Sequence, residues 1–192
     1  MKTLNFFLYF TVILSVLSCT IEKNVDFKKY SILTTPIEIG EFYNIKVDTS
    51  GSSESAFVKK WKDGHFDLTY TYDSPESDKY SPLYYSIEIS KSNSEKEANR
   101  KFDLIKKIIL RPRSSTSNET VIEYDSIILS GDQNFYAVRN WNGEPNGVLF
   151  LYRKKNIVYT LKTSGYFKND HTFIKNLVEP KLITLENFRL KN

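Results

Sequence analysis

The sequence predicts an α+β domain: an antiparallel sheet of about six to eight strands with two main helices, at about 94–110 and 170–187. Segments of apolar–polar alternation recur along the chain, which is typical of half-buried strands. Connections of hairpin length join several of them, which favours antiparallel neighbours. Two stretches with apolar residues at helical spacing follow capping signals. The expected order is four strands, a helix, four strands and a helix.

The first group of strands lies before residue 90. The Asp63-Gly64 pair separates two strand candidates and is typical of a tight hairpin. In the segment after it, Phe66, Leu68 and Tyr70 fall on one face. Strands are expected at 42–47, 56–61, 66–72 and 83–89, with a shorter candidate at 30–33 that Thr35-Pro36 ends.

The first main helix has clear boundary signals. Ser94, with Glu97 three residues on, forms a capping-box pattern. Pro112 is expected to end the helix, because proline cannot donate the next backbone hydrogen bond. Between them, apolar residues follow at the spacing of one helical face: Ala98, Phe102, Ile105 and Ile109.

The second half of the chain repeats this pattern. Gly131-Asp132, Asn146-Gly147 and residues 154–156 are short connections between strand candidates. Asp170 is expected to cap the last helix, and Pro180 to kink or split it. The strands are expected at 121–129, 135–141, 148–153 and 157–163.

The N-terminus has the features of an export signal. Lys2 precedes an apolar run from Leu4 to Leu17, which is too short to span a hydrocarbon core of about 30 Å. The run ends in Val16-Leu17-Ser18-Cys19, which resembles the lipobox of bacterial lipoproteins. The resemblance implies a signal peptide at 1–18, a lipidated Cys19 with a tether at 19–29, and a single domain at 30–192.

In that family the cysteine carries acyl chains such as palmitate, and two or more chains anchor a protein stably to a membrane. Thr20 stands where an Asp usually retains such proteins at the inner membrane, so we expect the bacterial cell envelope and its outer membrane. Two alternatives stay open. The chain is either secreted with Cys19 as a free thiol, or held by an uncleaved N-terminal anchor.

The C-terminal third is similar to the PsbP/Mog1-like fold. The likeness rests on residues 135–138, 148–152, 157–161 and 185–188, whereas the first half lacks that family's early Pro-x-x-Trp. The resemblance implies an adaptor or binding role, because that fold is mostly non-catalytic.

Composition narrows the classes of function. The 192 residues suffice for one domain with a sizeable core. A formal net charge of +4 is too mild to favour nucleic acid as a partner. With two histidines, one cysteine and none of the common catalytic or nucleotide-binding motifs, we expect no cofactor, no metal site and no enzyme activity.

The strongest candidate binding site is the segment 141–147. Trp141 closes one strand and a polar, glycine-bearing loop follows, so Trp141 would be an exposed anchor for a partner. Arg139 lies on the same face and could stack on Trp141. Asn142 and Glu144 complete the candidate site. The alternative is a long hairpin with Trp141 folded inward.

Two further clusters of charged residues are explained by local structure without a function. Asp63, His65 and Asp67 could form an acid–base site, but the hairpin signal favours a solvated tip. Basic residues at the end of the first helix favour its dipole, and contact with anionic headgroups is the alternative. They are Lys106, Lys107, Arg111 and Arg113.

Together these features predict a lipid-anchored envelope protein with a non-enzymatic binding or adaptor role toward another envelope or exported protein. An immunity or inhibitor lipoprotein that blocks a toxin is one alternative, and an enzyme acting on envelope polymer is another. A structural component of an envelope machine is a third.

We predict that Cys19→Ser releases the protein from membranes, because acyl chains on this thiol are the expected anchor. Fractionation of cells that express either form measures this. If the variant still sediments with membranes, the N-terminal segment rather than a lipid holds the protein.

Overall fold

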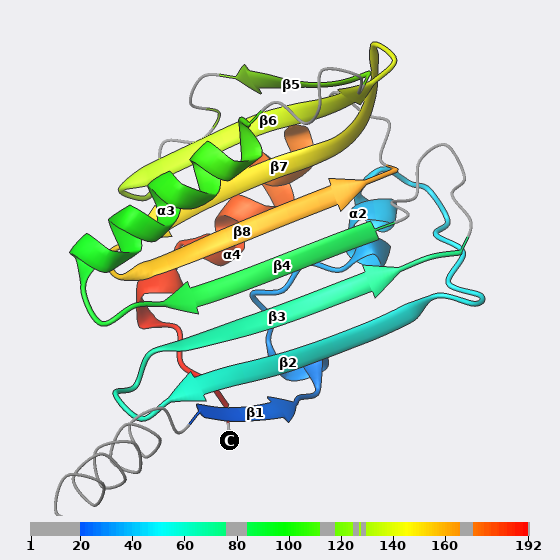
Figure 1. Ribbon diagram of the computed structural model, residues 1–192. Helices are drawn as coiled ribbons and strands as arrows, with labels where there is room; N and C mark the ends of the chain where they lie inside the picture. Colours follow the sequence, from blue (N-terminus) through cyan, green and yellow to red (C-terminus); the bar gives the residue numbers. More distant parts are fainter. Residues whose placement is uncertain are drawn as a thin grey trace, which may run out of the picture.

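A computed structural model describes residues 20–75, 84–111, 118–124, 127, 130–165 and 171–191. It is dominated by one antiparallel sheet of eight strands, in the order β1-β2-β3-β4-β8-β7-β6-β5 (Figure 1). Cys19, Pro112, Arg113 and Asp170 lie outside the described residues. The strands are β1 (Thr20–Asn24), β2 (Ser53–Trp61), β3 (Phe66–Asp73), β4 (Tyr84–Lys91), β5 (Glu119–Tyr124), β6 (Gln133–Trp141), β7 (Glu144–Lys154) and β8 (Ile157–Ser164).

The sheet consists of two halves, each a run of neighbouring antiparallel strands. β1 to β4 pair in sequence, and so do β5 to β8. The last strand, β8, joins the halves by pairing with β4, with Ile87 opposite Leu161 and Ile89 opposite Tyr159. Helix α3 (Glu95–Ile109) leads from β4 toward β5 at the far edge.

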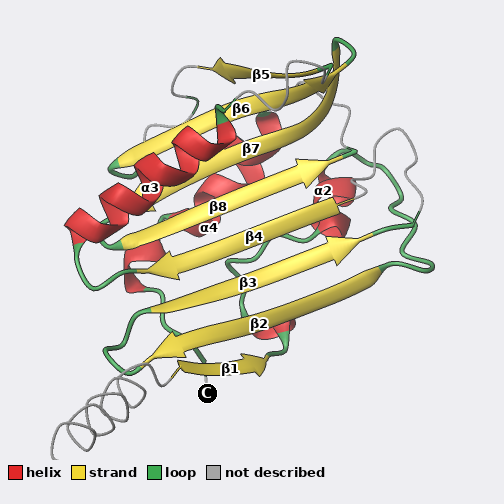
Figure 2. Ribbon diagram, viewed as in Figure 1, coloured by secondary structure: helices red, strands yellow, loops and turns green. Residues whose placement is uncertain are grey.

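The helices lie on both faces of the sheet. Helix α3 crosses the front of β8, β7 and β6, and the other helices lie behind the sheet (Figures 1 and 2). The front of β2, β3 and β4 has no helix over it in this view. The elements behind are η1 (Phe27–Lys29), α2 (Pro36–Phe42), the π-helical η2 (Ile174–Val178), α4 (Glu179–Leu182) and η3 (Leu185–Asn187).

Each face has its own apolar cluster. The larger one lies behind the sheet, where side chains such as Leu68, Ile87 and Leu161 pack against α2, η2 and α4. The smaller one lies in front, where Ala98 and Phe102 of α3 are buried against the sheet. Its sheet members are Phe135, Ala137, Leu149, Leu151 and Val158.

The start of α3 agrees with its sequence signal. Ser94 caps the helix, and its hydroxyl accepts a hydrogen bond from the Glu97 backbone amide at 3.2 Å. The Glu97 carboxylate accepts a hydrogen bond from the Asn93 backbone N–H at 3.1 Å. In a standard capping box the donor would be the next residue, Ser94. These contacts fix the point at which α3 leaves β4.

Three expectations for the N-terminal third are wrong. Residues 20–24 form β1, paired with β2, rather than a tether. The strands expected at 30–33 and 42–47 are absent. Thr35-Pro36 begins helix α2 instead of ending a strand: Thr35 and Glu38 form a capping box, and proline suits the first helical position.

The order of elements therefore differs from the expected one. A helix separates β1 from β2, so the chain runs strand, helix, three strands, helix, four strands and then helical segments. The last helix is divided, as Pro180 suggests: η2 ends at Val178 and α4 covers residues 179–182. The sheet-dominated α+β class is confirmed.

Candidate functional site

The uncovered front of β2, β3 and β4 is polar. Residues that are paired across antiparallel strands point to the same face of the sheet. Starting from Leu151 of the front cluster, successive strand pairings lead through Glu88 and Thr69 to Phe57, so these side chains lie on the front face. Phe57 is 40 % exposed. We call this area the open face; its exposed and half-buried residues are Ser55, Phe57, Lys59, Asp67, Thr69, Thr71 and Glu88, and Ser86 and Ser90 of the same face are buried.

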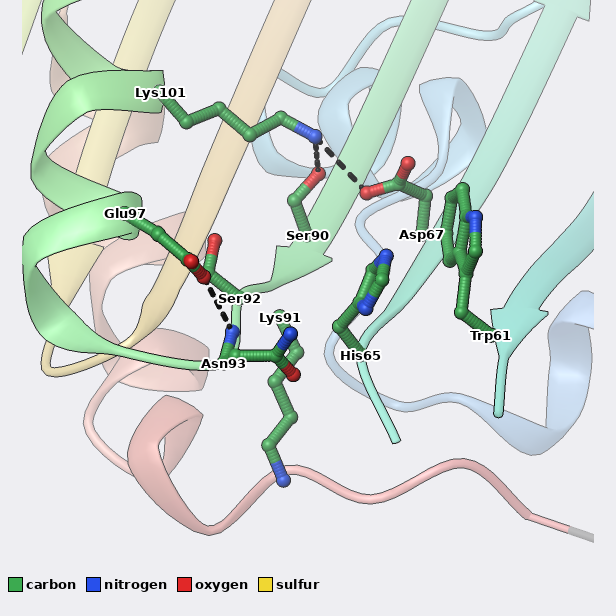
Figure 3. A pocket seen from close by; sticks show the side chains of 9 residues that line it. All are labelled: Trp61, His65, Asp67, Ser90, Lys91, Ser92, Asn93, Glu97 and Lys101. Carbon is green, nitrogen blue, oxygen red and sulfur yellow. Dashed lines mark hydrogen bonds and ion pairs between the residues drawn. The ribbon is translucent and has the colours of Figure 1, made fainter. Parts of the chain in front are cut away.

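A pocket of about 410 Å³ lies at one end of the open face, between the β2–β3 hairpin and α3 (Figure 3). It is formed where β2 ends, β3 begins and β4 turns into α3, so residues far apart in sequence meet there. Its lining is mixed in charge and contains two aromatic rings. The lining residues are Trp61, His65, Asp67, Ser90, Lys91, Ser92, Asn93, Glu97 and Lys101.

The hairpin provides one wall of the pocket. Gly64 has a φ of +94°, which allows the tight turn between Trp61 and His65. The two rings stack with centroids 4.2 Å apart and an interplanar angle of 18°. In Figure 3 His65 lies between Trp61 and Asn93, with Trp61 on the side away from α3. Trp61 therefore supports His65.

The hairpin is tied to the start of α3. The Asp63 carboxylate accepts a hydrogen bond from the Asn93 side chain at 2.8 Å, and this bond is the main cause of a lowered pKa at Asp63. Nδ1 of His65 contacts the same carboxylate. These links hold His65 against Trp61 and join two sides of the pocket.

Lys101 of α3 forms the opposite wall. Its ammonium lies 3.0 Å from the Asp67 carboxylate and donates a hydrogen bond to the Ser90 hydroxyl at 2.6 Å (Figure 3). It also lies 3.1 Å from the Glu88 carboxylate. Partial burial disfavours the Lys101 charge, but the carboxylates of Glu88 and Asp67 outweigh that effect and raise the pKa of Lys101.

The expectation of a solvated tip for Asp63, His65 and Asp67 is only partly right. Asp63 is exposed at the tip, whereas His65 and Asp67 are half-buried and line the pocket. Each is held by a different partner, His65 by Asp63 and Asp67 by Lys101. This arrangement gives a fixed ring beside paired charges and hydroxyls, which suits recognition of a polar ligand group.

The expected 141–147 loop is a tight turn. Trp141 pairs with Glu144, and the turn consists of Asn142 and Gly143 alone, with φ of 53° and 84°. Positive φ at both positions suits the Asn-Gly turn that favours two-residue hairpins. Trp141 is 47 % exposed, so the inward-folded alternative is wrong.

The other candidate residues around Trp141 have structural partners. The Arg139 guanidinium pairs with the Glu119 carboxylate of β5 at 3.1 Å, and both side chains are largely buried. Asn142 accepts a hydrogen bond from Asn118 at 2.6 Å. Glu144 is exposed. The binding role of Trp141 stays a prediction, and it lies at the opposite end of the sheet from the pocket.

Several pocket residues belong to no motif or local pattern in the sequence. Lys101 stands on the helix flank and Ser90 near the end of a strand, both ordinary places for polar residues. Their meeting depends on α3 folding back over the sheet. The alternation of Asp67 and Thr69 with apolar residues in β3 was the available sign that this face is not fully buried.

No protein-family model matches this chain, and neither curated proteins nor solved structures give a significant match. Within the described residues, no helix has the length and apolar character needed to cross a membrane. The same residues contain no group of three or more His, Cys, Asp or Glu placed to hold a metal ion.

We predict that Lys101→Met lowers the free energy of unfolding by about 1–3 kcal/mol, because two partly buried carboxylates lose their shared cation. The matched control is Lys155→Met, which removes a more exposed pair with Glu186 and should cost less than about 1 kcal/mol. Urea unfolding measures both variants. Equal losses would contradict a special role for Lys101.

The Lys101 contribution also depends on pH. Because the folded-state pKa of Lys101 lies above its usual 10.5, the stability it adds is fully present below pH 10.5 and is lost as the pH rises through the folded-state value. From pH 7 upward, the difference between wild type and Lys101→Met should therefore shrink only above pH 10.5. A difference that disappears at neutral pH would contradict this.

We predict that Trp141→Ala changes the free energy of unfolding by less than about 1 kcal/mol, because its side chain is half exposed at the end of a hairpin. Thermal melting measures the effect. A loss of about 3–5 kcal/mol, as expected for a buried large aromatic, would place Trp141 in the core.

Proposed function

We propose that this chain is a lipid-anchored protein of the bacterial cell envelope, held at the outer membrane through Cys19. Its role is to bind another envelope or exported protein, without catalysis. The lipobox-like Val16-Leu17-Ser18-Cys19 supports the anchor, and the open face supports the binding role.

The open face is the observation that carries the proposal. Strands β2 and β3, together with Glu88 of β4, present a polar surface with Phe57 partly exposed on it and Trp61 at its end. The hydroxyl side chains of Ser55, Thr69 and Thr71 lie beside Phe57 on this face. Aromatic rings among small polar side chains are typical of surfaces that recognise proteins, because the rings provide area and the hydroxyls provide hydrogen bonds.

The pocket supports binding over chemistry. Lys101 neutralises the carboxylates of both Asp67 and Glu88. A general base has to reach a substrate proton, whereas these carboxylates are already engaged by an ammonium group. Fixed, paired charges instead favour one orientation of a bound partner and disfavour others.

We predict that Thr69→Arg abolishes or strongly weakens capture of the partner, because it puts a long side chain in the middle of the open face. Ile183→Arg is the matched control, since Ile183 is exposed behind the sheet after α4. Both variants should melt near the wild-type temperature.

The measurement is a pull-down from solubilised envelopes with each purified protein, followed by titration of the captured protein. Equal capture by all three forms would contradict binding at the open face. Release of chemically altered envelope polymer by the wild-type protein alone would contradict the non-enzymatic role.

A further inference from the structure

A basic and apolar surface lies along the edge strand β1, on the face of the sheet opposite to the open face. Ile21 is 61 % exposed at its centre. Lys23 and Lys60 flank it from β1 and β2, and Lys191 approaches from the C-terminal segment, whose end lies near β1 in Figure 1. We call these four residues the β1 surface. They line a hollow of about 150 Å³ with Tyr30, Val58 and Leu190.

The lysines of the β1 surface differ from their neighbour Lys59. Lys59 points to the other face and pairs with Glu22 at 2.7 Å. No described carboxylate forms an ion pair with Lys23, Lys60 or Lys191, and no acidic residue lines the hollow. Three ammonium groups thus gather around an exposed isoleucine, a combination typical of surfaces that meet anionic lipid headgroups.

The chain connects this surface directly to the proposed anchor. β1 begins at Thr20, which pairs with Trp61. Cys19 directly precedes Thr20 in the sequence, so a single peptide bond joins it to β1. A tether of ten residues would let the domain turn freely above the membrane. Since β1 takes up the start of that segment, a lipid on Cys19 keeps the edge of the sheet at the headgroups.

We propose that the β1 surface rests on the anionic phospholipid headgroups of the membrane that holds Cys19, with Ile21 entering the interface. The inference depends on the proposed lipid anchor and adds the orientation of the domain. With β1 at the membrane, the open face lies on the other side of the sheet from the lipid contact and stays accessible to a protein partner.

The basic end of α3 is a poorer candidate for this contact. Lys106 pairs with Glu123, and its ammonium also lies 4.7 Å from the centre of the Phe135 ring. Helix α3 packs on β7 and β8, in the half of the sheet that is farther from β1. A lipid on Cys19 would not bring that end of α3 to the headgroups first.

The test uses the processed full-length lipoprotein, purified from membranes and reconstituted in vesicles. A fluorophore is attached to Ile21→Cys or, as the control, to Glu144→Cys, which is exposed at the opposite end of the sheet. Lipids with a nitroxide headgroup quench a fluorophore that touches the membrane surface. The vesicles contain either phosphatidylglycerol or only phosphatidylcholine.

We expect the label at position 21 to be quenched several-fold more than the label at 144 in phosphatidylglycerol vesicles. The difference should fall in phosphatidylcholine, at high salt, and when Lys23, Lys60 and Lys191 are changed together to Gln. Each lysine should change occupancy of the surface-bound orientation by roughly five-fold, which corresponds to about 1 kcal/mol.

Equal quenching at the two positions, or quenching that ignores the lysines, would overturn the inference. If the label at position 21 is shielded from a water-soluble quencher in native membranes but not in vesicles, the inference is also overturned, and the β1 edge contacts a protein partner instead. The anchor is judged separately: if the wild-type protein does not float with vesicles, the proposed function fails, whereas floating with equal quenching rejects only the orientation.

Discussion

The pairing of β4 with β8 is the constraint on which the rest of the structure depends. It joins the two halves of the sheet along eight residue pairs, from Tyr84 opposite Ser164 to Lys91 opposite Ile157. Because β8 occupies the place beside β4, the chain after β4 has to reach the far edge before it can return through β5, β6 and β7. Helix α3 makes that crossing over the front of the second half, so the front of β2, β3 and β4 has no helix over it.

This crossing explains the different burial of the two halves. Strand β7 has α3 on one side and the main apolar cluster on the other, and residues 147–152 are all buried. Strand β3 has helices only behind it, and its burial alternates along its length. The same crossing brings Lys101 over β3 and β4, where it holds Asp67 and Glu88. The pocket is thus a consequence of the topology.

Sequence patterns predicted the parts of the fold that depend on local signals. The alternation in β3 and the cap at Ser94 are such signals. The N-terminal third was wrong because Thr35-Pro36 can end a strand or begin a helix, and only the Glu38 side chain decides between them. Thr20–Asn24 is polar because β1 is an edge strand, and such a sequence resembles a tether.

The candidate site was harder to predict. Trp141 was found because it stands beside turn residues, but the pocket needs β2, β3, β4 and α3 together, and sequence spacing does not bring Trp61 and Lys101 side by side. His65 and Asp67 were noticed as neighbours in the chain, whereas their separate partners follow from pairings across the fold. Local sequence patterns predict individual strands and helices. Which polar residues from distant segments come together depends on the order of strands in the sheet, which local patterns do not contain.

The central claim is that the anchored protein binds a partner through the open face. A photo-crosslinking residue placed at Thr69, and another at Ile183 behind the sheet, tests it in living cells. The account predicts a discrete crosslinked protein from position 69 that is absent from position 183. Crosslinking from position 183 alone, or the same pattern from both positions, would contradict it.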